Sequence, residues 1–208
     1  MSTFFVNRLP TLVFLLLLVV QTSVTHAQQR IVVLGDSISA AYGISVAEGW
    51  VQLLKDRIAN ENIKVINASI SGETTSGGST RISQVLHDHK PSILILELGA
   101  NDGLRGLSIQ TMRANLSTII EQTLNHPARI LLLGMNIPAN YGQTYTSQFE
   151  QTYSELAQTY QLELVPSFLG TVGLDYDLMQ EDGIHPNSAA QAILLDQLWP
   201  QLKVMLQN

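Results

Sequence analysis

The feature of this sequence that most constrains its fold is a regular alternation of short apolar runs with longer stretches of helical periodicity. The apolar runs predict strands over residues 30–34, 64–67, 93–98, 130–134 and 162–165. Near-continuous runs of this kind are typical of strands that are buried on both faces, as in parallel sheets. The alternation therefore predicts an α/β domain built on a mainly parallel sheet of five strands.

Apolar side chains recur at helical spacing between these runs, so each predicted helix has one face that can pack on the sheet. The five series are Trp50, Leu53, Leu54 and Ile58; Ile82, Val85, Leu86 and His89; Met112, Leu116, Ile119, Ile120 and Thr123; Phe149, Tyr153, Leu156, Ala157 and Tyr160; and Ala190, Ile193, Leu194 and Leu198. Ser147 and Glu150 predict a capping box at the start of the fourth helix. The fifth helix is predicted to follow Pro186 and to end near Pro200.

Residues 1–27 have the pattern of a secretory signal peptide and not of a folded element. Arg8 supplies the positive charge, residues 12–20 are apolar without interruption, and Thr25-His26-Ala27 is a plausible cleavage site. Nine apolar residues are too few to span a bilayer, which takes about 20. We therefore expect residues 28–208 to form one exported domain in the periplasm, with secretion or an uncleaved membrane anchor as the alternatives.

Composition excludes several kinds of chemical site and argues against one class of partner. Cysteine is absent, which excludes disulfides, thiolate metal sites and lipid attachment to cysteine. Without residues 1–27 the chain carries 10 basic and 17 acidic side chains, a formal charge of −7. Because nucleic-acid binding needs a basic face, this balance argues against a nucleic-acid partner.

The loops that follow the strands are the places to search for a site, because ligands of open α/β sheets bind outside the carboxyl ends of the strands. Ser37 follows the first predicted strand, Gly72 lies in a Gly/Ser/Thr-rich loop after the second, and Asn101 follows the third. Backbone N–H groups and an amide at such positions can stabilise developing negative charge. Taken alone, Ser37 and Asn101 are more typical of ordinary turns, and the Gly72 loop is as compatible with a mobile turn as with a ligand site. Asp36 is expected to support the turn beside Ser37.

The segment "QEDGIHPN" places Asp182 three residues before His185 and Pro186 directly after it. Pro186 biases His185 away from the helical region, so a turn is predicted here. In such a turn the Asp182 carboxylate can hold one ring nitrogen of His185 while the other nitrogen faces a nucleophile. This is the arrangement that a general-base histidine needs.

The other histidines of the mature chain lie near the ends of predicted helices, where the helix dipole favours them. They are His87, His89 and His126. A zinc site built on His87-Asp88-His89 would need further ligands that the sequence does not place, so no metal and no cofactor are expected.

Four motifs together resemble the GDSL or SGNH hydrolase superfamily. They are Ser37 in "GDSIS", Gly72 in "SISGETTSGG", Asn101 in "GAND" and His185 in "DGIHPN", and the resemblance runs from about residue 30 to the last helix. Ile38 stands where the family's usual name implies leucine, a conservative apolar change. Within this superfamily, three segments resemble those of small periplasmic esterases with acyl-CoA thioesterase, lysophospholipase and arylesterase activity. The segments are "ELGANDGLRG", "PANYG" and "MQEDGIHPN".

The resemblance implies a flavodoxin-like three-layer α/β/α fold with strand order 2-1-3-4-5. It also implies that Ser37 attacks an acyl carbonyl, with His185 as the general base and Asp182 orienting it. The oxyanion would be met by the backbone N–H groups of Ser37 and Gly72 and by the Asn101 amide. We expect a monomer that takes a small-molecule acyl ester or thioester, lysophospholipids included.

Two loops that flank the predicted triad suit an adaptable acyl pocket, because they are rich in Gly, Pro and apolar residues. The candidate pocket residues are Leu104, Leu107, Pro138 and Tyr141. Three alternatives stay open from the sequence. They are a carbohydrate or acetyl-ester deacetylase with the same triad, a metal-dependent phosphoesterase with Asp36, Asp182 and His185 as ligands, and a non-catalytic periplasmic binding protein.

Overall fold

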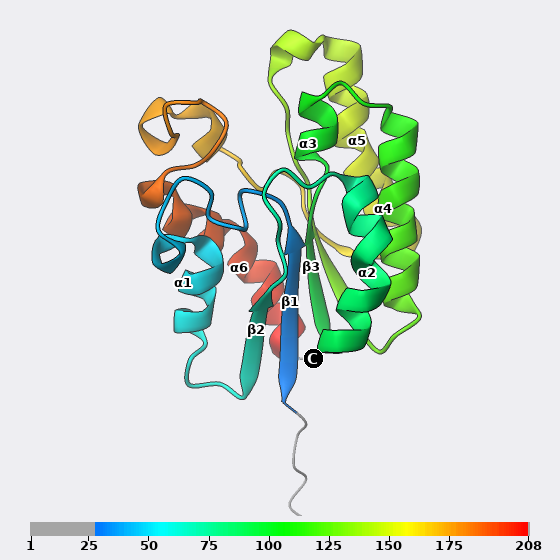
Figure 1. Ribbon diagram of the computed structural model, residues 1–208, viewed down its shortest axis with the longest axis vertical. Coiled ribbons are helices and arrows are strands. Elements are labelled where there is room, and N and C mark those ends of the chain that lie inside the picture. The colour runs from blue at the N-terminus through cyan, green and yellow to red at the C-terminus, as the bar shows by residue number, and fades with distance from the viewer. Residues whose placement is uncertain (1–27, 208) are drawn as a thin grey trace, which may run out of the picture.

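A parallel sheet of five strands lies at the centre of the computed structural model, which describes residues 28–207 (Figure 1). The strands are β1 (Gln29–Gly35), β2 (Ile63–Asn67), β3 (Ile93–Glu97), β4 (Arg129–Leu133) and β5 (Glu163–Val165). Their order is β2-β1-β3-β4-β5. The predicted parallel sheet and the strand order implied by the resemblance are therefore confirmed.

The strands β1 and β3 pair in register, with Ile31 opposite Ile93 and Gly35 opposite Glu97. Every residue of β3 is buried, and so is β1 from Ile31 onward. Helices cover both faces of the sheet, so the side chains that point to either face are removed from water. This double burial explains why the strand runs carry no polar alternation.

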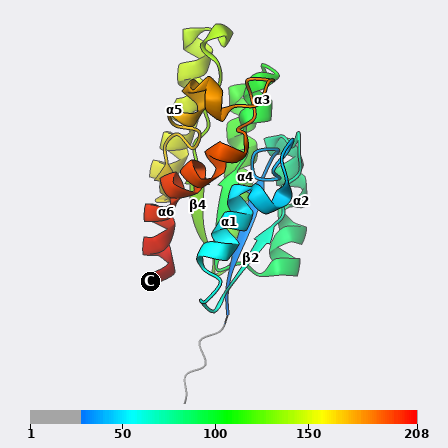
Figure 2. The ribbon, with the colours of Figure 1, turned by 90° about the vertical axis from the view of Figure 1, so that its left-hand side faces the viewer.

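Two helical layers enclose the sheet. One layer holds α1 (Trp50–Arg57) and α6 (Gln191–Gln207), which pack side by side and face the viewer in Figure 2. The other holds α2 (Thr75–His89), α4 (Ile109–Leu124) and α5 (Gln143–Tyr160), in which α4 contacts both neighbours. A short helix, α3 (Ala100–Leu104), follows β3 directly at the carboxyl edge, where the sequence predicts only a loop.

Two predicted helix boundaries are wrong. Helix α5 begins at Gln143 after Gly142, so Ser147 and Glu150 lie inside it and form no capping box. The first buried apolar residue of α5 is Phe149, so the apolar periodicity begins later than the helix itself. Helix α6 continues through Pro200 to Gln207, because the side chains of Leu202 and Met205 beyond it are buried and their packing offsets the lost backbone hydrogen bond.

The predicted signal peptide, residues 1–27, lies outside the described residues. From residue 28 to residue 207, no helix is both long enough and apolar enough to cross a membrane.

Candidate active site

The residues singled out in the sequence gather at the carboxyl edge of the sheet, the upper end in Figure 1. Ser37 lies in the turn after β1, Gly72 in the loop between β2 and α2, and Asn101 in the first turn of α3. Asp182 and His185 lie in the segment that precedes α6. Each reaches the site from a different part of the chain.

Ser37, His185 and Asp182 form a hydrogen-bonded chain. The His185 Nε2 atom lies 2.9 Å from Ser37 Oγ, and His185 Nδ1 lies 2.6 Å from Asp182 Oδ2. The imidazole is thereby held between a carboxylate and a hydroxyl. This arrangement lets His185 take a proton from Ser37 while Asp182 stabilises the resulting cation.

The turn that carries Asp182 and His185 is closed by its own hydrogen bonds. Asp182 Oδ1 accepts the backbone N–H groups of Ile184 at 2.9 Å and of His185 at 3.0 Å. Gln180 N–H donates to the His185 carbonyl at 2.7 Å, which ties both ends of the turn together. The Tyr42 ring packs on the His185 ring with 4.7 Å between centroids. The imidazole therefore has one well-defined position.

Asp182 is ionised at neutral pH. Burial raises the pKa of its carboxyl group. The hydrogen bonds from the His185 ring and from the backbone of His185 and Ile184 have the larger combined effect and lower the pKa to about 2. An ionised carboxylate accepts hydrogen bonds only, so it selects the tautomer with a proton on His185 Nδ1. The unprotonated Nε2 then faces Ser37.

Three N–H donors at this edge are available to a ligand. Among residues 28–207, the backbone N–H groups of Ser37 and Gly72 donate to no protein acceptor. Asn101 Nδ2 donates one hydrogen to Asp36 Oδ2 at 3.0 Å and keeps its second hydrogen. Gly72 has a φ of +77°, which favours glycine, and Arg105 Nη2 donates to its carbonyl at 2.9 Å.

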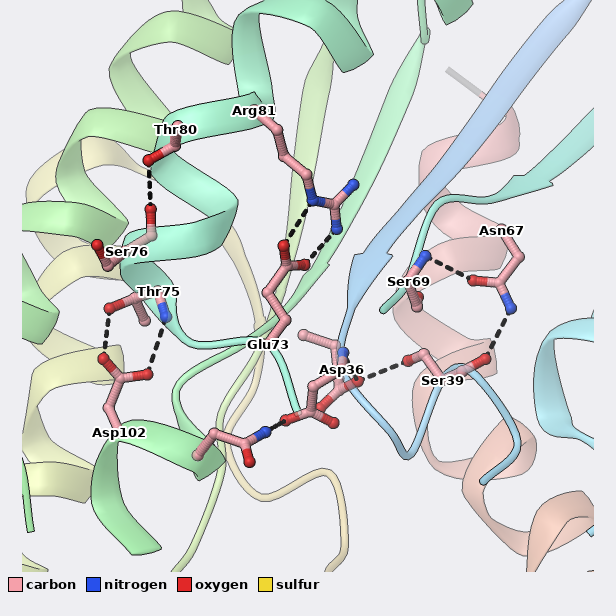
Figure 3. A network of polar contacts seen from close by, with 12 residues as sticks. Asp36, Ser39, Asn67, Ser69, Glu73, Thr75, Ser76, Thr80, Arg81 and Asp102 are labelled. Atoms are coloured by element: carbon pink, nitrogen blue, oxygen red, sulfur yellow. Dashed lines mark hydrogen bonds and ion pairs between the residues drawn. The ribbon is translucent and has the colours of Figure 1, made fainter. Parts of the chain in front are cut away.

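Asp36 supports the nucleophile turn, as the sequence predicts. Its Oδ1 atom accepts the Ile38 backbone N–H at 3.1 Å, while Oδ2 holds Asn101. Beneath the turn lies Glu97, whose Oε2 accepts the Ser39 hydroxyl at 2.6 Å. Figure 3 shows Asp36 and Ser39 side by side in this network.

A second polar cluster positions α3 and hence Asn101. The carboxylate of Asp102 accepts the backbone N–H of Thr75 at 2.8 Å and its hydroxyl at 2.6 Å (Figure 3). Asp102 thus caps the N-terminus of α2 from another helix. Glu73, beside Gly72, pairs with Arg81 through Arg81 Nε at 2.6 Å.

Sequence reasoning missed several of these supporting residues. They are Tyr42, Glu73, Glu97, Asp102 and Arg105. One of them carries a signal in the sequence, since Glu97 is a lone acid within the apolar run "ILILEL". The others are ordinary loop and helix residues whose neighbours become known only from the fold.

A cleft of about 720 Å³ opens next to the triad. Its wall includes Ile38 and Ala100, the neighbours of Ser37 and Asn101, and also Leu104 and Pro138. Leu107 and Tyr141 do not line it. The hydroxyl group of Tyr141 donates to the Leu104 carbonyl at 2.7 Å, so Tyr141 supports the wall through Leu104.

Within the described part of the chain, no three acidic or histidine side chains are placed where they could hold a metal ion together. His87 and Asp88 contact each other at the exposed end of α2, 3.0 Å between Nδ1 and Oδ1. Asp36 is bonded to Ile38 and Asn101 instead of sharing a site with Asp182 and His185.

Replacement of Asp182 by Asn is expected to lower kcat by about 10⁴ while leaving the turn intact. The Asn oxygen can still accept the two backbone N–H groups, but its NH₂ group would face His185 Nδ1 and force the wrong tautomer. Asp182→Ala is expected to lower both kcat and Tm. Ester hydrolysis and thermal unfolding of the two variants test this, and unchanged kcat in Asp182→Asn would contradict it.

The sequence matches the GDSL-like lipase/acylhydrolase family over residues 33–193. It is 44% identical over 182 residues to the esterase TesA of Pseudomonas aeruginosa, covering 86% of this chain and 90% of that protein. It is 38% identical over 193 residues to an Escherichia coli protein named as a thioesterase, a protease and a lysophospholipase, covering 93% of this chain and 92% of that one.

A solved esterase structure is also similar to this protein. The crystal structure of the psychrotrophic esterase EstA from a Pseudoalteromonas species, inhibited by monoethylphosphonate, superposes with a TM-score of 0.81. The two chains are 38% identical, and the match covers 86% of this chain and all of EstA, 100%.

Proposed function

Since this chain belongs to the GDSL-like lipase/acylhydrolase family, we propose that it cleaves carboxylic esters and thioesters through an acyl-enzyme on Ser37. Its enzyme class, an ester and thioester hydrolase, follows from relatives that match most of its length. The observation that carries the assignment of the nucleophile is the 2.9 Å contact between His185 Nε2 and Ser37 Oγ.

In the first step, Ser37 Oγ attacks the acyl carbonyl and His185 Nε2 takes the hydroxyl proton. The carbonyl oxygen becomes an oxyanion, which accepts hydrogen bonds from the Ser37 and Gly72 backbone N–H groups and the Asn101 amide. His185 then passes its proton to the leaving alkoxide or thiolate. The acyl group stays on Ser37 as an ester.

In the second step, a water molecule replaces the leaving group. His185 Nε2 takes a proton from this water, whose oxygen attacks the acyl-enzyme, and the same three donors meet the second oxyanion. His185 returns the proton to Ser37 Oγ as the carboxylic acid departs. Asp182 remains ionised throughout, and no cofactor takes part in any step.

The cleft beside the triad would hold the acyl chain. Its wall includes Ile38 and Ala100, the chain neighbours of Ser37 and Asn101, and continues over the apolar side chains of Leu104 and Ile137. A cleft of this volume suits fatty-acyl esters, acyl thioesters and lysophospholipids better than acetyl esters alone. We place the mature protein, from residue 28, in the periplasm as a monomer, with residues 1–27 as its cleaved signal peptide.

Fluorophosphonate labelling with peptide mapping tests the assignment of the nucleophile. The label is expected on Ser37 and is lost in Ser37→Ala. Ser37→Ala or His185→Ala is expected to lower kcat by up to roughly 10⁶, and Asn101→Ala by about 10² to 10³. A folded Ser37→Ala variant with full esterase activity would overturn the proposal.

A chain-length series of p-nitrophenyl esters tests the acyl cleft. Leu104→Glu places a charge in the wall and is expected to lower kcat/KM for octanoyl esters at least about tenfold more than for acetyl esters, because each buried CH₂ contributes about 0.8 kcal/mol. Leu107→Glu is the matched control, since Leu107 is exposed outside the wall. Equal losses for both chain lengths in Leu104→Glu would count against this cleft as the acyl site.

A further inference from the structure

We propose that Glu97 is a positioning residue of the oxyanion hole, a neutral buried carboxyl group that holds Asp36 and, through Asp36, the donor orientation of the Asn101 amide. This inference rests on the proposed function, because it concerns the same oxyanion. It assigns a task to a side chain that the mechanism above does not use.

Glu97 occupies an unusual place for an acid. It is the last residue of β3, it has no exposed surface, and it lies opposite Gly35 of β1 in the sheet register. A Cβ atom on Gly35 would approach Glu97 Oε2 to 2.6 Å, so only glycine lets the carboxyl group come this close to the nucleophile turn. An ionised carboxylate in such a place is strongly disfavoured.

The hydrogen bonds of Glu97 indicate where a proton lies. Its Oε2 atom accepts the Asp36 backbone N–H at 3.2 Å and the Ser39 hydroxyl at 2.6 Å. Its Oε1 atom is also buried, and no donor from the described residues reaches it. A buried carboxylate oxygen without a donor is costly, whereas a protonated Oε1 is itself a donor that needs an acceptor.

The acid next to Glu97 is Asp36, whose backbone N–H already donates to Glu97 Oε2 at 3.2 Å. The Asp36 and Glu97 carboxyl groups are both buried, and two ionised carboxylates next to each other in a buried place repel. Burial and the negative charge of Asp36 raise the pKa of Glu97 well above its usual range. Burial raises the pKa of Asp36 only to about 6, because hydrogen bonds from Ile38, Glu97 and Asn101 oppose it. Because Glu97 has no exposed surface and its Oε1 atom has no donor, we assign the proton of this pair to Glu97.

The position of this proton decides how Asn101 is oriented. An Asn amide has a donor end and an acceptor end of nearly the same shape. An ionised Asp36 accepts only, so it attracts Nδ2, repels Oδ1 and leaves the second Nδ2 hydrogen free to face the oxyanion. A protonated Asp36 could donate to Oδ1 as well, and the flipped amide would offer a repulsive oxygen to the oxyanion.

A double-mutant cycle with Asn101→Ala tests the proposal, with kcat and KM measured on one ester. Glu97→Met removes both the donor and the acceptor of the carboxyl group at similar volume. It is expected to lower kcat about 10- to 100-fold with little change in KM, which is part of the cost of losing the Asn101 donor. Glu97→Gln is expected to restore most of kcat, because Gln keeps one donor and one acceptor. In the Asn101→Ala background, Glu97→Met should lower kcat less than about threefold further.

Two results would overturn the proposal: equal losses from Glu97→Met with and without Asn101, or a Glu97→Gln variant as inactive as Glu97→Met. If Glu97→Met does not fold, Asp36→Asn replaces it in the double-mutant cycle with Asn101→Ala. The losses in kcat from the two substitutions are again expected not to add.

Infrared spectroscopy tests the proton directly and without activity. At a pH above the usual titration range of carboxyl groups, the wild type is expected to show the C=O band of a protonated carboxylic acid. Ser37→Ala should retain this band, Glu97→Gln should lack it, and its absence from the wild type would overturn the proposal. Failure of the proposed function would give a different result: the protein would show the band, but fluorophosphonate would not label Ser37.

Discussion

The pairing of β1 with β3 is the contact on which the active site depends. It sets the carboxyl ends of two central strands side by side, with Gly35 opposite Glu97. The chain leaves β1 into the turn that carries Ser37, and it leaves β3 into the helix that carries Asn101. The bond from Asn101 to Asp36 then joins the two exits, so nucleophile and amide keep a fixed distance as long as the strand pairing holds.

Three carboxyl groups near the nucleophile differ in charge state because their surroundings differ. Asp182 is half-exposed and accepts several hydrogen bonds, which lower its pKa to about 2. Glu97 is sealed between strands next to another acid, which raises its pKa well above the usual range. Asp36 lies between these extremes. One functional group, the carboxyl group, thus provides a permanent anion for His185, a buried neutral donor and an anionic acceptor for Asn101.

The parts of the fold that follow from local pattern could be predicted. Strands buried on both faces leave apolar runs, and helices packed on a sheet leave apolar faces, so all five strands and the five long helices are visible in the sequence. Boundaries that depend on packing could not be predicted in this way. Helix α6 passes Pro200 because buried side chains lie beyond it, and α5 starts before its apolar face does.

By itself, the sequence determined the fold class, the strand order through its family resemblance, and the identity of the residues that the structure brings together at the carboxyl edge. Residue type and spacing indicated the pair of Asp182 and His185, because an acid three residues before a histidine can orient its ring, whereas the role of Ser37 as nucleophile came from the family resemblance. Only the tertiary structure decided the rest: that Leu104 and not Leu107 lines the cleft, and that Glu97 lies beneath Asp36. Exposure, protonation and hydrogen-bond partners arise from residues distant in the chain, and no local pattern records them.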